Sequence, residues 1–292
     1  MSDQPLAEVF GFPIDNLSIQ AEHYRNSRLC PYNNKVPSCT KSKAKDPLGV
    51  CSVYASNELA ITCPVRFRQD WKVVSDAAAF FFPSSTTWVA LSEIRLHDGD
   101  GQSAGNIDYV LVAYDDKGHV IDFGAVEVQS VYISGNVRRP FEYYMEDRVN
   151  RTQMEWSSTF VRADYLSSSR KRLVPQLLYK GKIIHAWQKK TAIVLHENFY
   201  TTLPELPVVE PENAEVAWLI YGLDLNSATN QYQLSLRETI YTRYQPSLDK
   251  ITTPPVGEID EFINLLQNKL DDKLGDDDLP DEFVSLKDIL GN

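Results

Sequence analysis

The sequence predicts a mixed α/β fold, because segments with strand character and segments with helical spacing both occur along the chain. Two runs rich in β-branched and aromatic residues, 106–114 and 120–132, flank Asp115-Asp116-Lys117-Gly118, a typical hairpin turn. Further strands are expected at 191–196, 215–225 and 231–244, the last two paired through residues 226–230. Helical spacing is found at 174–190 and again after residue 257.

The composition is that of a soluble globular protein. The chain has 292 residues, of which 43% are hydrophobic, enough to build a large core. No stretch approaches the roughly 18 to 20 apolar residues of a membrane span, and the first residues lack the basic start and apolar run of a signal peptide. We therefore expect a cytoplasmic protein with no membrane partner. In that compartment the four cysteines are expected to be metal ligands or buried thiols instead of disulfides.

The charge is distributed unevenly along the chain. The net charge is −11, which alone would argue against a nucleic-acid partner. Residues 257–292, however, hold eleven acids and three lysines, so the other 256 residues carry only −3. Residues 137–190 hold twelve Lys or Arg and five acids, a balance of +7. An acidic tail thus conceals a basic middle that could bind DNA.

The remaining elements follow in chain order. Residues 1–21 lead into a helix over IQAEHYRN, capped by Asp15 or Asn16, and 22–72 is rich in turns. Residues 73–95 predict a helix, a break at Pro83, and a second short helix or a strand. Pro175 is expected to start the helix at 174–190.

The domain boundaries expected are 1–72 for the cysteine-bearing segment, 73–256 for the core with its basic region 137–190, and 257–292 for an acidic, amphipathic tail that includes Asp276–Asp278.

Polar residues inside the predicted hairpin suggest a metal site. Alternation places Glu127 and Gln129 on one face of a strand, and a slightly staggered hairpin brings Asp108 alongside. Two adjacent carboxylates repel unless a cation lies between them, and Mg²⁺ binds one or two carboxylates together with water and phosphate oxygens. Glu93 is a further acid, expected to approach from the preceding helix. The alternative is that these acids simply face solvent.

The four cysteines, Cys30, Cys39, Cys51 and Cys63, lie within 34 residues among several prolines. Their wide, loop-borne spacing suits a tetrahedral thiolate site that ties an otherwise unpatterned segment together. Such a site would be structural, since four protein ligands leave no position for a substrate. The alternative is four buried free thiols.

Several segments together closely resemble NotI-type (NotI/EagI-like) type II restriction endonucleases. They are LCPYNNKVPSCTKSKAKDPLGVCSVYASNELAITCPVRF (29–67), SEIRL (92–96), SAGNIDYVLV (103–112) and GAVEVQSVYISGN (124–136). The resemblance covers most of the chain, and two unrelated motifs recur in it in the same order. It implies a PD-(D/E)xK nuclease core with a mixed sheet flanked by helices, acting as a homodimer on a GC-rich palindrome in double-stranded DNA.

The resemblance also assigns roles to residues. It implies that Asp108, Glu127 and Gln129, with Glu93, form the Mg²⁺-dependent catalytic set, and that Gln129 stands where most such nucleases have a lysine. It implies one structural iron on the four cysteines, although four thiolates suit zinc equally well. That metal segment would hold the surrounding cations near DNA. These cations are Lys35, Lys41, Lys43, Lys45, Arg66 and Arg68.

Base readout and phosphate contacts need well-placed arginines and lysines. The residues expected to contact DNA are Arg138, Arg139, Arg148, Arg151, Arg170, Lys171 and Arg172. The function predicted is therefore sequence-specific hydrolysis of DNA; a functional pairing with a protecting DNA methyltransferase is left open. Two alternatives stay open: a DNA-binding protein that has the fold without the chemistry, and a rubredoxin-like electron carrier, which the wide cysteine spacing disfavours.

Overall fold

The computed structural model describes residues 4–33, 36–43, 45–55, 58–156 and 161–274, apart from the side chains of Lys43 and Leu274. The chain divides into two compact units, Met1–Thr252 and Thr253–Asn292. Across the described ranges, no helix is long and apolar enough to cross a membrane.

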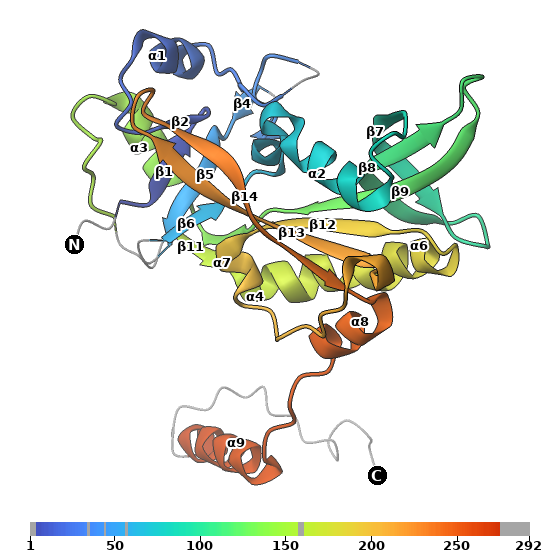
Figure 1. Ribbon diagram of the computed structural model, residues 1–292. Helices are drawn as coiled ribbons and strands as arrows, with labels where there is room; N and C mark the ends of the chain where they lie inside the picture. The colour runs from blue at the N-terminus through green and yellow to red at the C-terminus, as the bar shows by residue number, and fades with distance from the viewer. Residues whose placement is uncertain (1–3, 34–35, 44, 56–57, 157–160, 275–292) are drawn as a thin grey trace. The chain divides into compact units, whose positions relative to one another are not determined.

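A six-stranded mixed sheet forms the centre of the first unit (Figure 1). Its strands in spatial order are β14 (Gln231–Thr242), β13 (Val216–Asn226), β12 (Thr191–His196), β9 (Val120–Gln129), β8 (Ser103–Tyr114) and β7 (Trp88–His97). Strands β7, β8 and β9 form an antiparallel meander, β9, β12 and β13 are parallel, and β13 and β14 are antiparallel. The predicted α/β class, the hairpin and the later strands are thus confirmed.

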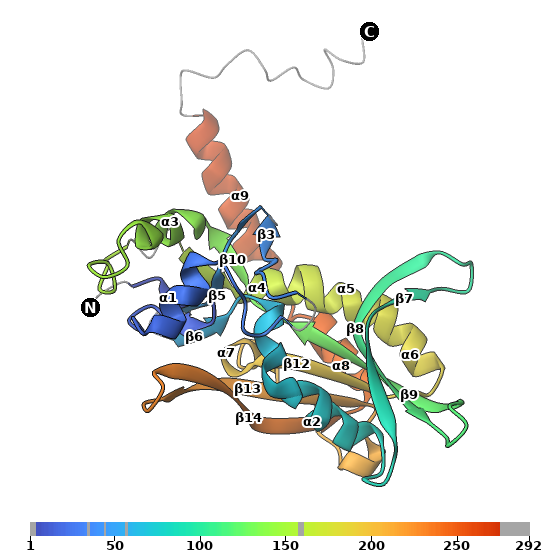
Figure 2. The ribbon, with the colours of Figure 1, turned by 90° about the horizontal axis from the view of Figure 1, so that it is seen from above.

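Helices cover both faces of this sheet (Figures 1 and 2). On one face α2 (Lys72–Phe81) packs Val74, Ala77 and Phe81 into a cluster with alternate residues of the sheet, among them Val126 and Val194. On the other face a continuous helix runs from Tyr165 to Ala186. Burial on both faces explains why β12 is apolar from Ala192 to Leu195.

The long helix begins nine residues before the predicted start at residue 174. It consists of α4 (Tyr165–Ser168), a π turn (Ser169–Leu173), α5 (Val174–Gln176), a second π turn (Leu177–Gly181) and α6 (Lys182–Ala186). Pro175 was predicted to start the helix, but it lies inside. A proline within a helix removes one backbone donor and crowds the preceding turn, and the widened π turns on either side accommodate this.

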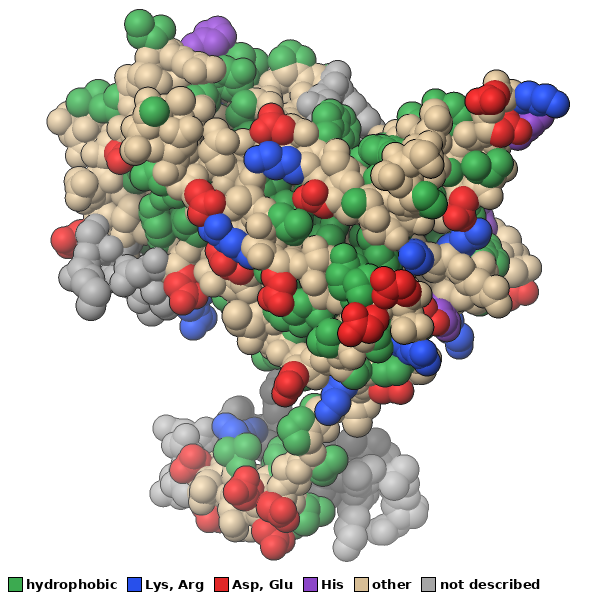
Figure 3. Space-filling model, viewed as in Figure 1, with side chains coloured by type: hydrophobic (Ala, Val, Ile, Leu, Met, Phe, Trp, Pro, Cys, Tyr) green, Lys and Arg blue, Asp and Glu red, His purple; other side chains and the backbone are tan. Residues whose placement is uncertain are grey.

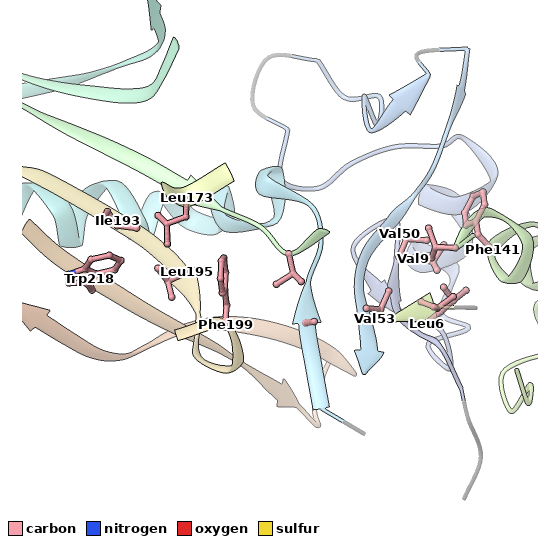
Figure 4. Close-up of a cluster of buried hydrophobic side chains, with 14 of the residues drawn as sticks. Leu6, Val9, Val50, Val53, Phe141, Leu173, Ile193, Leu195, Phe199 and Trp218 are labelled. Atoms are coloured by element: carbon pink, nitrogen blue, oxygen red, sulfur yellow. The ribbon is translucent and has the colours of Figure 1, made fainter. Parts of the chain in front are cut away.

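The N-terminal part of the first unit contains a second sheet that the sequence did not predict. It has the order β2 (Phe12–Pro13), β1 (Leu6–Val9), β5 (Val50–Ala55) and β6 (Glu58–Ile61). Figure 4 shows how Leu6, Val9, Val50 and Val53 of this sheet share one apolar cluster with Leu195 and Trp218 of the large sheet. The cysteine-bearing segment is therefore packed onto the core by a common hydrophobic cluster.

A buried ion pair lies within this segment, and its arginine also contacts the rest of the unit. Glu8 and Arg66 are both fully buried, with 3.0 Å between Arg66 Nε and Glu8 Oε1. Arg66 also donates to the side chain of Gln69 and to the carbonyl oxygen of Tyr232, and Ser52 donates to Glu8. Arg66 was expected to lie near DNA; that expectation was wrong, because its guanidinium is used inside the protein.

The helix α1 (Ile19–Asn26) forms over IQAEHYRN as predicted. Its cap is Ser18, whose side chain accepts a hydrogen bond from the Ala21 N–H, and not Asp15 or Asn16. Asn16 instead turns its amide to the carbonyl oxygens of Thr229 and Asn230. A short polar side chain can satisfy several backbone partners, so sequence position alone did not identify the cap.

Shorter elements complete the first unit. They are β3 (Ser42–Lys43), β4 (Asp46–Pro47), the 3₁₀ segment η1 (Pro64–Trp71), β10 (Tyr132–Gly135), α3 (Arg138–Glu146), β11 (Val161–Asp164), α7 (Glu197–Tyr200), a 3₁₀ turn (Pro211–Asn213) and α8 (Tyr244–Thr252).

The second unit contains α9 (Ile259–Leu274), which confirms the predicted tail helix. Figure 3 shows both acidic and apolar side chains on it. The predicted run Asp276–Asp278 lies outside the described residues.

Candidate active site

Asp108 and Glu127 lie side by side on neighbouring strands. In the β8–β9 ladder Tyr109 pairs with Val126, so the next residues along, Asp108 and Glu127, lie opposite each other. The Val128 N–H donates a 2.8 Å hydrogen bond to Asp108 Oδ2, which fixes that carboxylate against β9. The expectation that the hairpin brings these two carboxylates together is confirmed.

Glu93 lies on β7, the strand on the other side of β8 from β9. In the β7–β8 ladder Ser92 pairs with Tyr109 and Ile94 with Ile107, so Glu93 lies at the level of Asp108. The expectation that Glu93 belongs to a helix was wrong, because the alternating and β-branched residues of 88–97 favour a strand. Glu93 has φ +59°, an uncommon conformation for a residue with a side chain, and its carboxylate is 4.0 Å from the Arg68 guanidinium.

Burial makes the carboxyl groups of Asp108 and Glu127 harder to ionise. It raises the pKa of Asp108, with the Val128 hydrogen bond acting in the opposite direction. Burial also raises the pKa of Glu127 to about 7, opposed by the charge of Lys180 and reinforced by that of Asp108. A half-buried and a buried carboxylate that face each other on adjacent strands need a nearby cation to be ionised together.

Lys180 provides a cation at this point. Its Nζ atom lies 2.6 Å from Glu127 Oε2 and donates a 2.7 Å hydrogen bond to the carbonyl oxygen of Asn106. The residue is 5% exposed and comes from the second π turn of the long helix. Lys180 was not among the predicted site residues.

A signal for Lys180 was nevertheless present in the sequence. Leu173, Leu177, Lys180 and Ile184 are spaced by four, three and four residues, the spacing of one buried helix face, and all four are buried. A lysine on such a stripe is costly to bury unless a carboxylate is opposite. The sequence predicted a helix over 174–190 but assigned no role to Lys180.

Gln129 lies two residues beyond Glu127 on the same face of β9 and is buried. Its side-chain amide contacts that of Gln176, which precedes Lys180 by one helical turn. The long helix therefore contacts Glu127 through Lys180 and Gln129 through Gln176.

The donor set limits which ions could bind here. Among the described residues, no three or more His, Cys, Asp or Glu side chains are arranged to hold a metal ion. A hard divalent ion at this site would therefore have Asp108 and Glu127 as protein ligands and take its other ligands from water and substrate, which is how proteins usually bind Mg²⁺. The chemistry of these two residues fits such an ion.

The four cysteines are neighbours, and all are free thiols. The Cys30 N–H donates to Pro37 in the strand-like segment that also bears Cys39, and the Cys63 N–H donates to the carbonyl oxygen of Cys51. Burial raises the pKa of Cys39 and Cys51, and that of Cys30 to about 11, with smaller contributions from the other thiols. In the described part of the chain, no three of these thiols are placed to hold one metal ion.

The predicted DNA-contacting residues fall into two groups. Three arginines form ion pairs within the chain: Arg138 with Asp46, Arg148 with Glu22, and Arg151 with Glu146. The other four are exposed, namely Arg139 and the run Arg170, Lys171 and Arg172, the last of which lies over the Tyr132 ring. The exposed run and Lys180 belong to one helix.

Among the cations of the cysteine segment, Lys35 lies outside the described residues and Lys41 binds carbonyl oxygens of Val50 and Thr62.

A family comparison supports a nuclease. The model of the restriction endonuclease NotI family matches residues 11–234, about three quarters of the chain, including every residue of the site described above. The fold and site thus belong to a restriction endonuclease, a class of hydrolases that act on double-stranded DNA. The chain is a member of the NotI restriction endonuclease family. No curated protein matches the chain.

Proposed function

We propose that the protein is a type II restriction endonuclease that cuts both strands of a GC-rich palindrome as a homodimer. The observation that carries this proposal is the pair of adjacent carboxylates, the half-buried Asp108 and the buried Glu127, in a chain of the NotI family. Carboxylates placed this way are unfavourable for stability alone and suit a centre that receives a cation and a phosphodiester.

Asp108 and Glu127 would hold a Mg²⁺ ion, which when bound lowers the pKa of water and stabilises negative charge on phosphate. The protein side of the reaction follows from the described contacts. The Val128 N–H orients Asp108. Gln129 is uncharged, so it can orient water or a phosphate oxygen by hydrogen bonds but supplies no positive charge.

The exposed run Arg170, Lys171 and Arg172 would bind the DNA backbone beside the cleavage site, because the same helix bears Lys180. Arg138, Arg139, Arg148 and Arg151 are the other proposed contacts. Replacing the run by three glutamines should reduce the salt dependence of DNA binding, each lost phosphate contact lowering the slope by about one.

We also propose that Cys30, Cys39, Cys51 and Cys63 bind one structural metal ion, iron or zinc. Their mutual proximity supports this, and binding would require the thiols to lose their protons and close around the ion. Elemental analysis of protein purified without added metal would test it. We expect one equivalent of iron or zinc per chain, which should disappear in a Cys51→Ala variant. Wild-type protein that contains no metal, and whose free energy of unfolding does not change when iron or zinc is added, would contradict the proposal.

The central experiment is cleavage of a large GC-rich DNA of known sequence with Mg²⁺, with Ca²⁺ and with EDTA, followed by mapping of the fragment ends. Discrete Mg²⁺-dependent ends at one palindrome are expected, and light scattering should give twice the mass of the chain. Binding to a defined site with no cleavage under any divalent ion would instead identify a DNA-binding protein that has lost the chemistry.

A further inference from the structure

We propose that Lys180 is the residue that supplies the positive charge of the cleavage centre and positions Glu127, a role that the uncharged Gln129 cannot fill. This inference rests on the proposed function and assigns that function a residue from outside the β8–β9 hairpin.

The contacts of Lys180 are those of a fixed cation. Its ammonium bridges two strands, because one hydrogen bond goes to the Asn106 carbonyl of β8 and the other to Glu127 Oε2 of β9. A lysine ammonium has three donors, and these are its two hydrogen-bond acceptors among the described residues. The third donor is available to a phosphate oxygen or to a water molecule. Glu127 Oε1 remains available as a ligand atom.

The helix is built so that Lys180 reaches this place. The π turn Leu177–Gly181 shifts the side chains of the helix relative to a regular α-helix, and π turns of this kind are common at functional sites. Leu177 and Ile184, on either side of Lys180, are buried and anchor the turn against the sheet. Gly105, with φ +108°, passes close to the lysine stem, where a Cβ atom would lie 3.8 Å from Lys180 Cδ.

Stability alone does not account for a lysine at this position. Replacing both members of a buried ion pair by apolar groups of similar volume is often neutral or stabilising, so the fold does not need the Lys180–Glu127 pair for its stability. Lys180 also cannot be explained by solvation, since its side chain is 6% exposed. The remaining explanation is that the centre uses the charge.

The first test compares Lys180→Met with Lys182→Met, which removes the same charge from an exposed position of the same helix. Single-turnover cleavage by Lys180→Met should be slower by about 10²-fold or more, comparable to the loss of one electrostatic contact to a transition state. DNA affinity in Ca²⁺ should stay close to that of the wild type, and Lys182→Met should cleave at the wild-type rate. The thermal midpoint of Lys180→Met should fall because Glu127 loses its buried partner, so cleavage rates are compared well below the midpoint of each variant. Lys180→Gln provides a second variant if Lys180→Met does not fold.

The second test moves the lysine. Gln129→Lys/Lys180→Met should cleave at least about tenfold faster than Lys180→Met, because the charge returns to the same centre from β9. A purely structural lysine would not be replaced in this way.

Calorimetric Ca²⁺ binding to the DNA complex gives a readout independent of cleavage. If Lys180 only occupies the ion's place, Lys180→Met binds Ca²⁺ more tightly and cleaves at the wild-type rate, which overturns the inference. Wild-type protein that cuts no DNA overturns the proposed function itself.

Discussion

Two regions of the molecule bury acidic groups close together, and burial has opposite consequences in them. In the sheet, burial raises the pKa of Glu127 to about 7, so the carboxylate still ionises near neutral pH and Lys180 contacts it. In the cysteine segment, burial raises the pKa of Cys30 to about 11, so the thiol stays neutral. The Cys51 thiol donates a hydrogen bond to the carbonyl oxygen of Gly49.

The difference comes from the ordinary pKa of each group, near 4 for carboxylic acids and near 8.5 for thiols. The same burial leaves one cluster charged and dependent on a cation, and the other neutral and stable by packing. The carboxylates are therefore ready for an ion and a phosphate, whereas the thiols must first lose protons to bind a metal.

The largest expected effect is that of Asp108→Ala. Removing this carboxylate should reduce the rate of cleavage by at least about 10³-fold, because ion binding and water activation both depend on it. DNA binding in Ca²⁺ should persist, since the basic residues are untouched. Cleavage assays and gel-shift titrations measure the two effects separately. Wild-type cleavage by this variant would remove the sheet cluster from the mechanism.

Next in size is Arg66→Met, which breaks the buried ion pair of Arg66 with Glu8. Glu8 would be left buried without its partner, so the free energy of unfolding should fall by about 3 to 5 kcal/mol. The folded protein should nevertheless cleave DNA at an unchanged rate, in contrast with Lys180→Met. Urea denaturation and cleavage by the folded fraction distinguish the two ion pairs; a loss of rate without a loss of stability would reverse their roles.

The sequence was sufficient to predict the strands around the site. Alternation, β-branched residues and the Asp115–Gly118 turn are local signals, and they correctly brought Asp108 next to Glu127. At 88–97 the local pattern fitted either a short helix or a strand, so the strand was only one of two predictions. Glu93 was therefore assigned to a helix, although it lies on β7.

The contribution of the long helix could not be predicted in the same way. Lys180 lies 53 residues from Glu127 along the chain, and their contact depends on a parallel crossover and on π turns around Pro175. The burial of Arg66 likewise depends on Glu8, 58 residues away. Local patterns carry no information on such pairings, which are set by tertiary packing.

A smaller effect is expected on the pH dependence of stability. The folded state raises the pKa of Glu127 from an ordinary 4.5 to about 7, so between these values it binds a proton that the unfolded chain has lost. The free energy of unfolding should therefore fall as the pH rises through this window, by up to about 3 kcal/mol from this group. In EDTA, Glu127→Gln should remove that fall. Parallel curves for the wild type and the variant between pH 4.5 and 7 would show that the carboxylate is not held as the structure indicates.

The smallest effect concerns the neutral cluster. With chelator and reductant present, Cys51→Ala should lower the free energy of unfolding by only about 1 to 2 kcal/mol, because it removes one small buried group and no charge. In metal-loaded protein the same substitution should cost more, since it also removes a ligand. Urea denaturation in both conditions measures the difference. Equal losses would mean that the thiols stabilise the segment by packing alone, and that the two regions differ in kind, one holding an ion and the other none.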